Sequence, residues 1–334
     1  MMHHDRSWRW FLMPWATGLI FLTLLPLIAS LGLSLTRIET DASGKRLTWV
    51  GADHYREALG VDTTHTRAPT DPWIWRLMGG RPSDPLCYRA LGNSLFYTLP
   101  AVPTGLALSL AAAMLLHQPY RGMGAFRALF YLPHVLGGAA TVLVWSWLLN
   151  PQFGWVNRMI GGAYRLVDPL IQLVTGYGTS DWPLPGWLYS PTWCKPAVIL
   201  MHAWTMGGAM LIFLAALRRV PDGLYEAARL DGAGVWPRFR HVTLPQITPA
   251  LLFNLVLGVI FAMQSFTEVY LLQNRSQDDG LLFYGLYLYQ VAFESPHRLG
   301  YAAALGWILT ALLSAVVIPL VGLSRRWMHY ASEG

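Results

Sequence analysis

Glu268 is the one acidic residue well inside an apolar run of this sequence, and Gln264 precedes it by four residues. Residues four apart share a face of a helix, so the carboxylate and the amide would project in the same direction. Ionisable residues inside apolar segments are functional candidates by default, because they are costly to bury in lipid. The pair therefore predicts a polar site that hydrogen-bonds hydroxyl groups of a solute. The alternative is that Glu268 lies near the outer interface and pairs with an arginine of a partner subunit.

Three further polar or aromatic residues inside apolar runs are weaker candidates for lining such a site: His202, Trp204 and Asn254. For each of them helix packing is the favoured interpretation, because polar side chains also join membrane helices. Trp204 stands out among the 16 tryptophans of the chain because most of the others fall near the ends of the runs. Indole rings at run ends are typical of the headgroup layer.

A second stretch with functional potential is YEAARLDGAGVWPRFRHVTLPQ, residues 225–246, which is polar and lies between two apolar runs. Pro221 and Asp222 before it are typical of a helix start. Gly232 and Gly234 would break that helix, since glycine fits a left-handed cap or a close backbone approach. The order predicts a helix, a tight turn and a second short helix.

The first of these helices has the composition of a docking element. Ala227 and Ala228 have small side chains that let a helix sit deep in a groove, and Glu226 offers a carboxylate to a basic residue of a partner. Composition alone leaves a second interpretation equally open, in which the stretch is a solvated loop with ordinary inside-positive charge.

The elements that must position these residues are membrane-spanning helices. The chain is 54% hydrophobic and only 13% charged, with mean hydropathy +0.36, which argues against a soluble globular enzyme. Six apolar runs have roughly the 20 residues that a span requires. They cover about 11–35, 92–116, 125–149, 196–217, 249–273 and 299–323. Backbone polar groups cannot stay unpaired in lipid, so we expect an all-α integral membrane protein with six transmembrane helices.

The first run has no small-residue cleavage site after Leu35, which predicts a retained span rather than a signal peptide.

Arginines flank the segments that we expect inside the cell, in agreement with the positive-inside rule. They are Arg6, Arg9, Arg121, Arg127, Arg218, Arg219, Arg325 and Arg326. This pattern predicts a cytoplasmic tail at 1–10, a transmembrane domain at 11–325 and a cytoplasmic tail at 326–334. The net charge of +6 is thus a matter of topology, and no basic stripe interleaved with aromatics indicates nucleic-acid binding.

The remaining segments are expected outside. A long loop at 36–91 contains a short amphipathic helix at 49–59, a second loop runs from 150 to 187, and 281–294 forms an interfacial helix. Cys87 and Cys194 both fall on this side. A disulfide between them is possible, but two free thiols are favoured in so cysteine-poor a chain.

The spacing of the polar stretch resembles the EAA loop of ABC-importer permeases. Glu226-Ala227-Ala228 is followed after three residues by Gly232, after nine more residues by Val242, and after one more residue by Leu244-Pro245. The family usually has Ile where this chain has Val242. The resemblance implies that residues 219–248 form a cytoplasmic coupling helix between spans 4 and 5, which docks into a cleft of an ATPase subunit. The residues implied in coupling are Glu226, Ala227, Ala228, Asp231, Gly232, Leu244 and Pro245.

Other stretches resemble the sugar and glycerol-3-phosphate branch of that family: 126–157, 214–234, 266–272 and 300–309. A glycine-rich turn usually follows the third of these, whereas this chain has NRSQDDG at 274–280. The resemblance implies a permease that forms half of the pathway for a carbohydrate or related polyol. It also implies ATPase subunits, a second permease chain (a heterodimer) and a periplasmic or lipid-anchored substrate-binding protein, in a bacterial inner membrane.

The energy source must lie on another chain. The only lysines are Lys45 and Lys195, and neither lies in a phosphate-binding P-loop. ATP and Mg²⁺ are therefore expected on the partner ATPase, with no cofactor, metal site or catalytic residue on this chain.

The alternative function is a self-sufficient secondary transporter of small polar solutes. It is disfavoured because such proteins show inverted repeats and several midplane charges. A membrane-embedded enzyme is disfavoured because no catalytic cluster occurs at the span ends.

Overall fold

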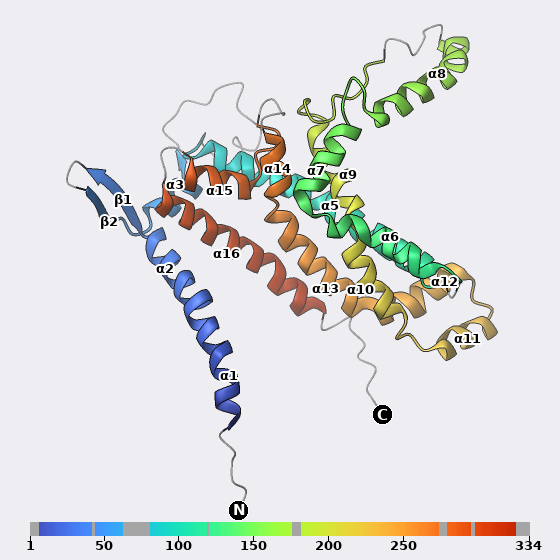
Figure 1. The fold of residues 1–334 in the computed structure, drawn as a ribbon, viewed down its shortest axis with the longest axis horizontal. Coiled ribbons are helices and arrows are strands. Elements are labelled where there is room, and N and C mark those ends of the chain that lie inside the picture. Colours follow the sequence, from blue (N-terminus) through green and yellow to red (C-terminus); the bar gives the residue numbers. More distant parts are fainter. Residues whose placement is uncertain are drawn as a thin grey trace, which may run out of the picture. The chain divides into compact units, whose positions relative to one another are not determined.

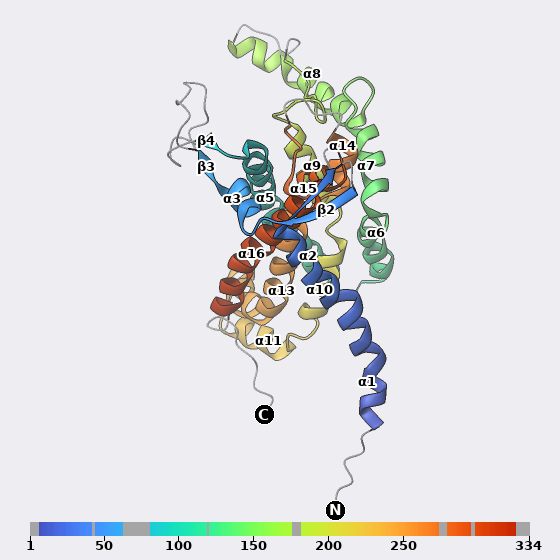
Figure 2. The same ribbon diagram turned by 90° about the vertical axis from the view of Figure 1, so that its left-hand side faces the viewer.

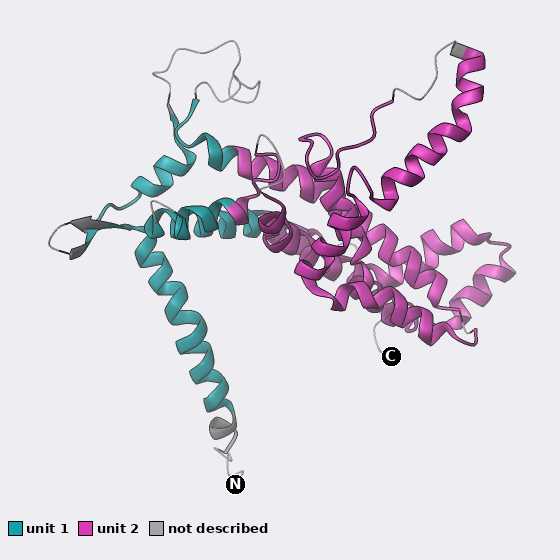
Figure 3. Ribbon diagram, turned by 45° about the horizontal axis from the view of Figure 1, so that its top comes forward, with its two compact units in different colours: residues 1–88, 287–315 teal, residues 89–286, 316–334 magenta. Residues whose placement is uncertain are grey.

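The computed structural model describes residues 7–41, 44–62, 81–118, 120–175, 182–273, 279–294 and 298–324. The chain forms two compact units, one of residues 1–88 with 287–315 and the other of residues 89–286 with 316–334 (Figure 3). Nearly all elements are helical (Figure 1). The C-terminal tail predicted at 326–334 and Arg325 lie outside the described residues, as do most residues of the N-terminal tail.

Among the described residues, four helical segments are long and apolar enough to cross a membrane: Leu12–Ser34, Pro85–Leu116, Val235–Leu272 and Leu299–Leu323. Two bent helix pairs pass the same test when each pair is taken together. The described spans number four, or six if each pair crosses once. All of these segments overlap the runs predicted from hydropathy, so the chain is an α-helical membrane protein with several spans.

The first unit begins with a nearly continuous rod of α1 (Ser7–Gly18), η1 (Leu19–Leu24) and α2 (Leu25–Ser34). A hairpin of β1 (Thr36–Asp41) and β2 (Gly44–Trp49) follows, with Ile38 opposite Leu47. Then come α3 (Asp53–Leu59) and a short pairing of β3 (Val61–Asp62) with β4 (Arg81–Pro82). The all-α prediction therefore missed two small antiparallel pairs in the loop at 36–91. The helix predicted at 49–59 begins only at Asp53, since Gly51 has a φ of +59° and separates it from β2.

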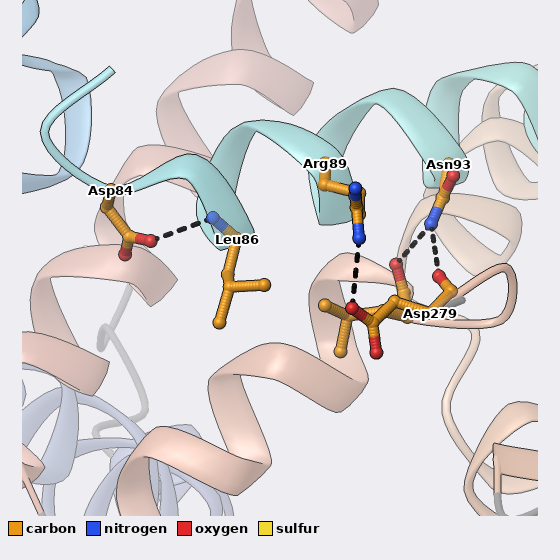
Figure 4. Close-up of polar contacts among 6 residues, drawn as sticks. Asp84, Leu86, Arg89, Asn93 and Asp279 are labelled. Atoms are coloured by element: carbon orange, nitrogen blue, oxygen red, sulfur yellow. Dashed lines mark hydrogen bonds and ion pairs between the residues drawn. The ribbon is translucent and has the colours of Figure 1, made fainter. Parts of the chain in front are cut away.

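Asp84 joins residues of the first unit that lie in three different helices. Its Oδ1 accepts the backbone N–H groups of Leu86 and Cys87 at 3.1 Å each, which caps the start of α5 (Pro85–Leu116) (Figure 4). Its Oδ2 accepts the hydroxyls of Tyr287 in α15 (Tyr284–Phe293) and Tyr301 in α16 (Leu299–Ser324). Burial, and next the hydrogen bond to Asp84, raise the pKa of Tyr287, so its hydroxyl remains a donor at neutral pH.

The second unit is built around α10 (Gly207–Leu217), which packs against both α6 (Met123–Val135) and α13 (Leu244–Met263). Gly207 makes the first contact possible, because a Cβ there would lie 2.6 Å from the carbonyl oxygen of Phe130. Close approach of helix backbones at small residues is the usual way that membrane helices associate. Leu110 and Leu116 of α5 complete the buried cluster beside α10.

Two of the predicted spans are bent. The run at 125–149 divides into α6 and α7 (Gly137–Leu148), whose axes differ by 96° at Gly137, where φ is +74°. The run at 196–217 divides into α9 (Cys194–Trp204) and α10, with a bend of 43°. Glycine adopts positive φ without the steric penalty of a Cβ, which explains the sharper of the two bends.

The loop predicted at 150–187 contains a helix that was not predicted from the sequence. Residues Trp155–Thr175 form the 21-residue helix α8, which includes Pro169. The helix escaped a search for long apolar runs because only one of its faces is apolar. In the second unit α8 lies at the opposite end from α11 (Asp222–Leu230), as both views agree (Figures 1 and 2).

Candidate functional sites

The stretch at 222–243 folds as a helix, a turn and a helical run. After α11, the chain forms α12 (Val235–Arg238) and η2 (Phe239–Thr243), which continue directly into α13. Pro221 has extended backbone and precedes the first residue of α11, and Asp222 contributes an acid to its first turn. The hydroxyls of Tyr225 and Thr243 are 3.0 Å apart and join α11 to η2.

Gly232 ends α11 in a Schellman motif. Its φ is +74°, its N–H donates to the carbonyl of Arg229 at 3.0 Å, and the N–H of Ala233 donates to the carbonyl of Ala228 at 2.9 Å. These are the two bonds that define the motif, and its left-handed position favours glycine. The glycine expected to break the helix thus has a direct conformational reason to be there.

An apolar surface is exposed around this turn. Leu230, Val235 and Trp236 are 89%, 75% and 67% exposed. Glu226 and Ala227 are exposed as well, whereas Ala228 is partly covered. Large apolar side chains gathered at such exposure mark interaction sites. Of the other residues implied in coupling, Asp231 and Gly232 are exposed in the turn, and Leu244 and Pro245 are half-buried at the start of α13.

A groove of about 720 Å³ lies between α11, α12 and the end of α5. Asp222, Glu226 and Arg229 line it from α11, Arg238 from α12, and His117 from the segment just after α5. Four charged residues of the loop therefore face this groove together with Val235, while Leu230 and Trp236 do not line it.

A second cavity, of about 270 Å³, lies where the fifth predicted span is interrupted. That run divides into α13 and α14 (Thr267–Leu272), and Gln264–Phe266 form the break. Gln264 is the residue that follows α13, and Glu268 lies in the first turn of α14. Both line the cavity. The spacing predicted that they share a face of one continuous helix, but they do not, because the break at 264–266 separates them. Ser265 lies 3.5 Å from the Glu268 carboxylate, and Glu268 forms no ion pair with any described residue.

Other helices of the second unit complete the cavity. His202 of α9 lines it, as do residues that sequence reasoning missed: Tyr97 of α5, and Thr141 of α7. Hydroxyl-bearing residues are common in apolar helices, so neither carried a signal in the sequence. Phe261 and Phe266 add aromatic surface to a lining that is otherwise rich in hydrogen-bonding groups.

The structure places the other two candidates elsewhere. Trp204 packs edge-on against Trp145, with ring centroids 5.9 Å apart, and does not line the cavity. Asn254 is buried in α13 at 5% exposure, also outside the cavity lining. Its Nδ2 has no hydrogen-bond partner among the described residues.

Segment 279–285 packs between α5 and the break in the fifth predicted span. Asn93 of α5 donates to the carbonyls of Asp279 and Leu282 at 3.0 Å each, and Arg89 contacts the Asp279 carboxylate at 3.0 Å (Figure 4). Gly285 follows, and a Cβ there would lie 3.3 Å from the carbonyl oxygen of Ser265. The described chain from Asp279 to Leu282 is thus anchored on α5.

The described residues contain no cluster of three or more His, Cys, Asp or Glu side chains arranged to hold a metal ion. Cys87 and Cys194 are both buried, and they are not joined by a disulfide in this structure.

An α-helical membrane protein with interrupted helices around a polar cavity, and with an exposed helical pair at one end, has the features of a transport subunit. Residues 93–330 match the model of the binding-protein-dependent transport system inner membrane component family. The chain belongs to this family of ABC transporter permeases.

Relatives agree with this assignment. The chain is 31% identical over 325 residues to the probable ABC transporter permease protein YesP of Bacillus subtilis, covering 97% of this chain and 92% of that one. It is 29% identical to the lactose transport system permease protein LacF of Rhizobium radiobacter, over 70% of this chain and 74% of LacF. Among solved structures, a chain of a bacterial ABC transporter that imports alginate has the same fold, with a TM-score of 0.67, 20% identity and 96% coverage of both chains.

Proposed function

We propose that this chain is the permease subunit of an ATP-driven importer and forms half of the pathway for a carbohydrate or related polyol. A separate ATPase would engage residues 219–248. The single observation that carries the proposal is the exposed helix pair α11–α12, whose Schellman turn places the glycine of the E-A-A-x₃-G spacing in its left-handed position.

Docking to the ATPase follows from the surface of this pair. Leu230, Val235 and Trp236 present apolar area to a partner, and such area yields roughly 25 cal/mol per Å² when it is covered. Ala227 lets α11 approach closely, and Glu226 offers a carboxylate to a basic residue. ATP and Mg²⁺ would be bound by the partner, and this chain would carry out no covalent chemistry.

The residues that line the cavity around Glu268 suit an uncharged, polyhydroxylated solute as the substrate. A carboxylate and the Gln264 amide accept and donate hydrogen bonds with hydroxyls, and Phe266 offers an aromatic face to an apolar sugar face. The negative charge of Glu268 disfavours anionic solutes such as phosphate esters. LacF, the relative named for lactose transport, points to the same substrate class.

The proposed topology has six crossings, with each bent pair counted as one span. Both termini and residues 219–248 would then face the cytoplasm of a bacterium, and 36–91 and 150–187 would face the periplasm. The position of α8 and α11 at opposite ends of the second unit agrees with this topology (Figure 2).

Transport would proceed by alternating access. Closure of the ATPase pair on ATP would draw the α11–α12 elements of two permease chains together. Since η2 continues into α13 without a break, a displacement of α11–α12 would be transmitted along α13 to the interruption at 264–266. Rigid helices with two discrete arrangements carry such coupling.

The experiment that tests the proposal is mild solubilisation of the tagged chain, followed by reconstitution. We expect an ATPase and a second multi-span protein to co-purify, and sugar uptake into proteoliposomes to require the binding protein and ATP. Uptake by this chain alone without ATP would instead support the alternative, a self-sufficient secondary transporter.

A further inference from the structure

Helix α8 has two sharply different faces. At 100° per residue, one half of its circumference carries only apolar residues. These are Trp155, Val156, Met159, Ile160, Ala163, Leu166, Val167, Leu170, Ile171, Leu173 and Val174. The opposite half carries Asn157, Arg158, Tyr164, Arg165, Asp168 and Gln172.

One strip of the polar half of α8, at Asn157 and Tyr164, contacts the protein. Asn157 is only 3% exposed; its amide donates to the carbonyl of Pro185 at 3.0 Å and its Oδ1 accepts from the indole of Trp187 at 2.7 Å. Tyr164, two turns further on, packs edge-on against Trp182 with centroids 5.3 Å apart. These contacts fix the rotation of α8 about its axis.

The apolar half therefore faces away from the described protein. Leu166 and Leu173 are 81% and 83% exposed, and Met159 and Leu170 are also exposed. An exposed apolar face of this width on a 21-residue helix must be covered by another molecule.

The surroundings of α8 identify this occupant as lipid. The preceding helix α7 belongs to a bent pair that is long and apolar enough to cross a membrane, and it ends at Leu148. The hydrogen bond from Gly154 to Asn150 at 2.9 Å keeps the link to Trp155 compact. The following helix α9 belongs to another such pair. Exposed indoles, which favour the headgroup layer, gather along this part of the chain. They are Trp147, Trp155, Trp182 and Trp193.

We propose that α8 is an interfacial helix, with its apolar face inserted between the headgroups and acyl chains of the bilayer. Arg158 and Arg165 on the polar half are exposed and suit anionic headgroups. The helix would anchor the 150–193 segment to the membrane surface beside the entrance of the pathway. Placement in the outer leaflet depends on the proposed topology, whereas insertion into lipid does not.

The test uses the full chain in liposomes of phosphatidylcholine and phosphatidylglycerol. Single cysteines replace Leu166 or Leu173 on the apolar face, with Arg165 or Gln172 as matched positions on the polar face, in a Cys87→Ser, Cys194→Ser background. Each cysteine carries a nitroxide, and its collision rates with oxygen and with a water-soluble nickel chelate are measured. We expect the oxygen-to-nickel ratio to be several-fold higher at 166 and 173 than at 165 and 172.

Equal ratios at all four positions would overturn the proposal, and so would shielding of 166 and 173 from both reagents, which would show a protein partner on this face. If the cysteine-free background fails to insert, the native background serves, because Cys87 and Cys194 are 2% and 0% exposed and should resist a bulky label. The measurement needs neither ATPase nor substrate, so its failure is distinguishable from a failure of the proposed transport function.

Discussion

Gly138 of α7 lies directly against the carboxylate of Glu268 on α14: a Cβ built at Gly138 would stand 2.9 Å from Oε1 of Glu268. The side chain of Thr267 is almost as close, at 3.2 Å. The absence of a side chain at Gly138 thus gives Glu268 its position in the cavity. Two residues 130 positions apart determine this geometry, and either can be altered separately.

Gly138→Ala should displace Glu268 without removing its charge. Overpacking at such a contact costs about 1–3 kcal/mol, and the flexible carboxylate is the group that yields most easily. We expect a reduced maximal rate of sugar uptake with normal membrane insertion, measured in proteoliposomes. Gly124→Ala in α6 is the matched control, since no atom lies within 4 Å of its added Cβ. Equal uptake by the two variants would refute the role of this contact.

Glu268→Gln retains shape and hydrogen-bonding groups but removes the charge. Hydrogen bonds to charged groups contribute about 1.5–3 kcal/mol, so we expect the concentration of sugar for half-maximal uptake to rise about tenfold or more. Asn254→Leu should leave this concentration unchanged, because Asn254 does not line the cavity. An effect of Asn254→Leu as large as that of Glu268→Gln would mean that the cavity is not the substrate site.

Gly232→Ala should weaken the turn after α11. An L-residue with a side chain held in the left-handed region costs about 1–2 kcal/mol. We expect less ATPase to co-purify and slower uptake, with unchanged insertion. Gly223→Ala is the control within the same helix, since the site is open and alanine favours helix. If the ATPase is retained equally by both variants, the turn is not part of the docking surface.

Glu226→Lys tests the polar part of the same surface. The side chain is exposed, so the substitution should leave the fold intact and replace an attraction to a basic partner residue with a repulsion. ATP-driven uptake should be lost while the chain still inserts. Normal uptake by this variant would exclude Glu226 from coupling.

Asn93→Ala should lower thermal stability, because it removes the side-chain donor from the buried carbonyl of Leu282. A buried group left unpaired costs about 1–3 kcal/mol, which corresponds to a fall of several degrees in Tm. Arg89→Ala is expected to change Tm little, since the Arg89–Asp279 pair is about half exposed. The comparison is made by thermal denaturation of the purified chain in detergent.

Local patterns predicted much of the fold. The apolar runs indicated the membrane helices because span length and composition are sufficient to require helix in lipid. The bends were not predictable, since Gly137 adopts positive φ only in the context of α6 and α7. Helix α8 was missed because hydropathy averaged over its two faces hides its amphipathic period, although that period is present in the sequence.

The sequence by itself determined that this protein is embedded in a membrane and that residues 225–246 form a helix, a turn and a further helical stretch. It also singled out Gln264 and Glu268 as candidates for one polar site, but not the helix break that separates them. These properties depend on residues less than about two turns apart or on composition summed over a span. Only the tertiary structure decided that Tyr97, Thr141 and His202 join the pair around one cavity, and that Trp204 and Asn254 do not. Packing of distant helices controls which polar side chains converge, and no local spacing encodes that contact.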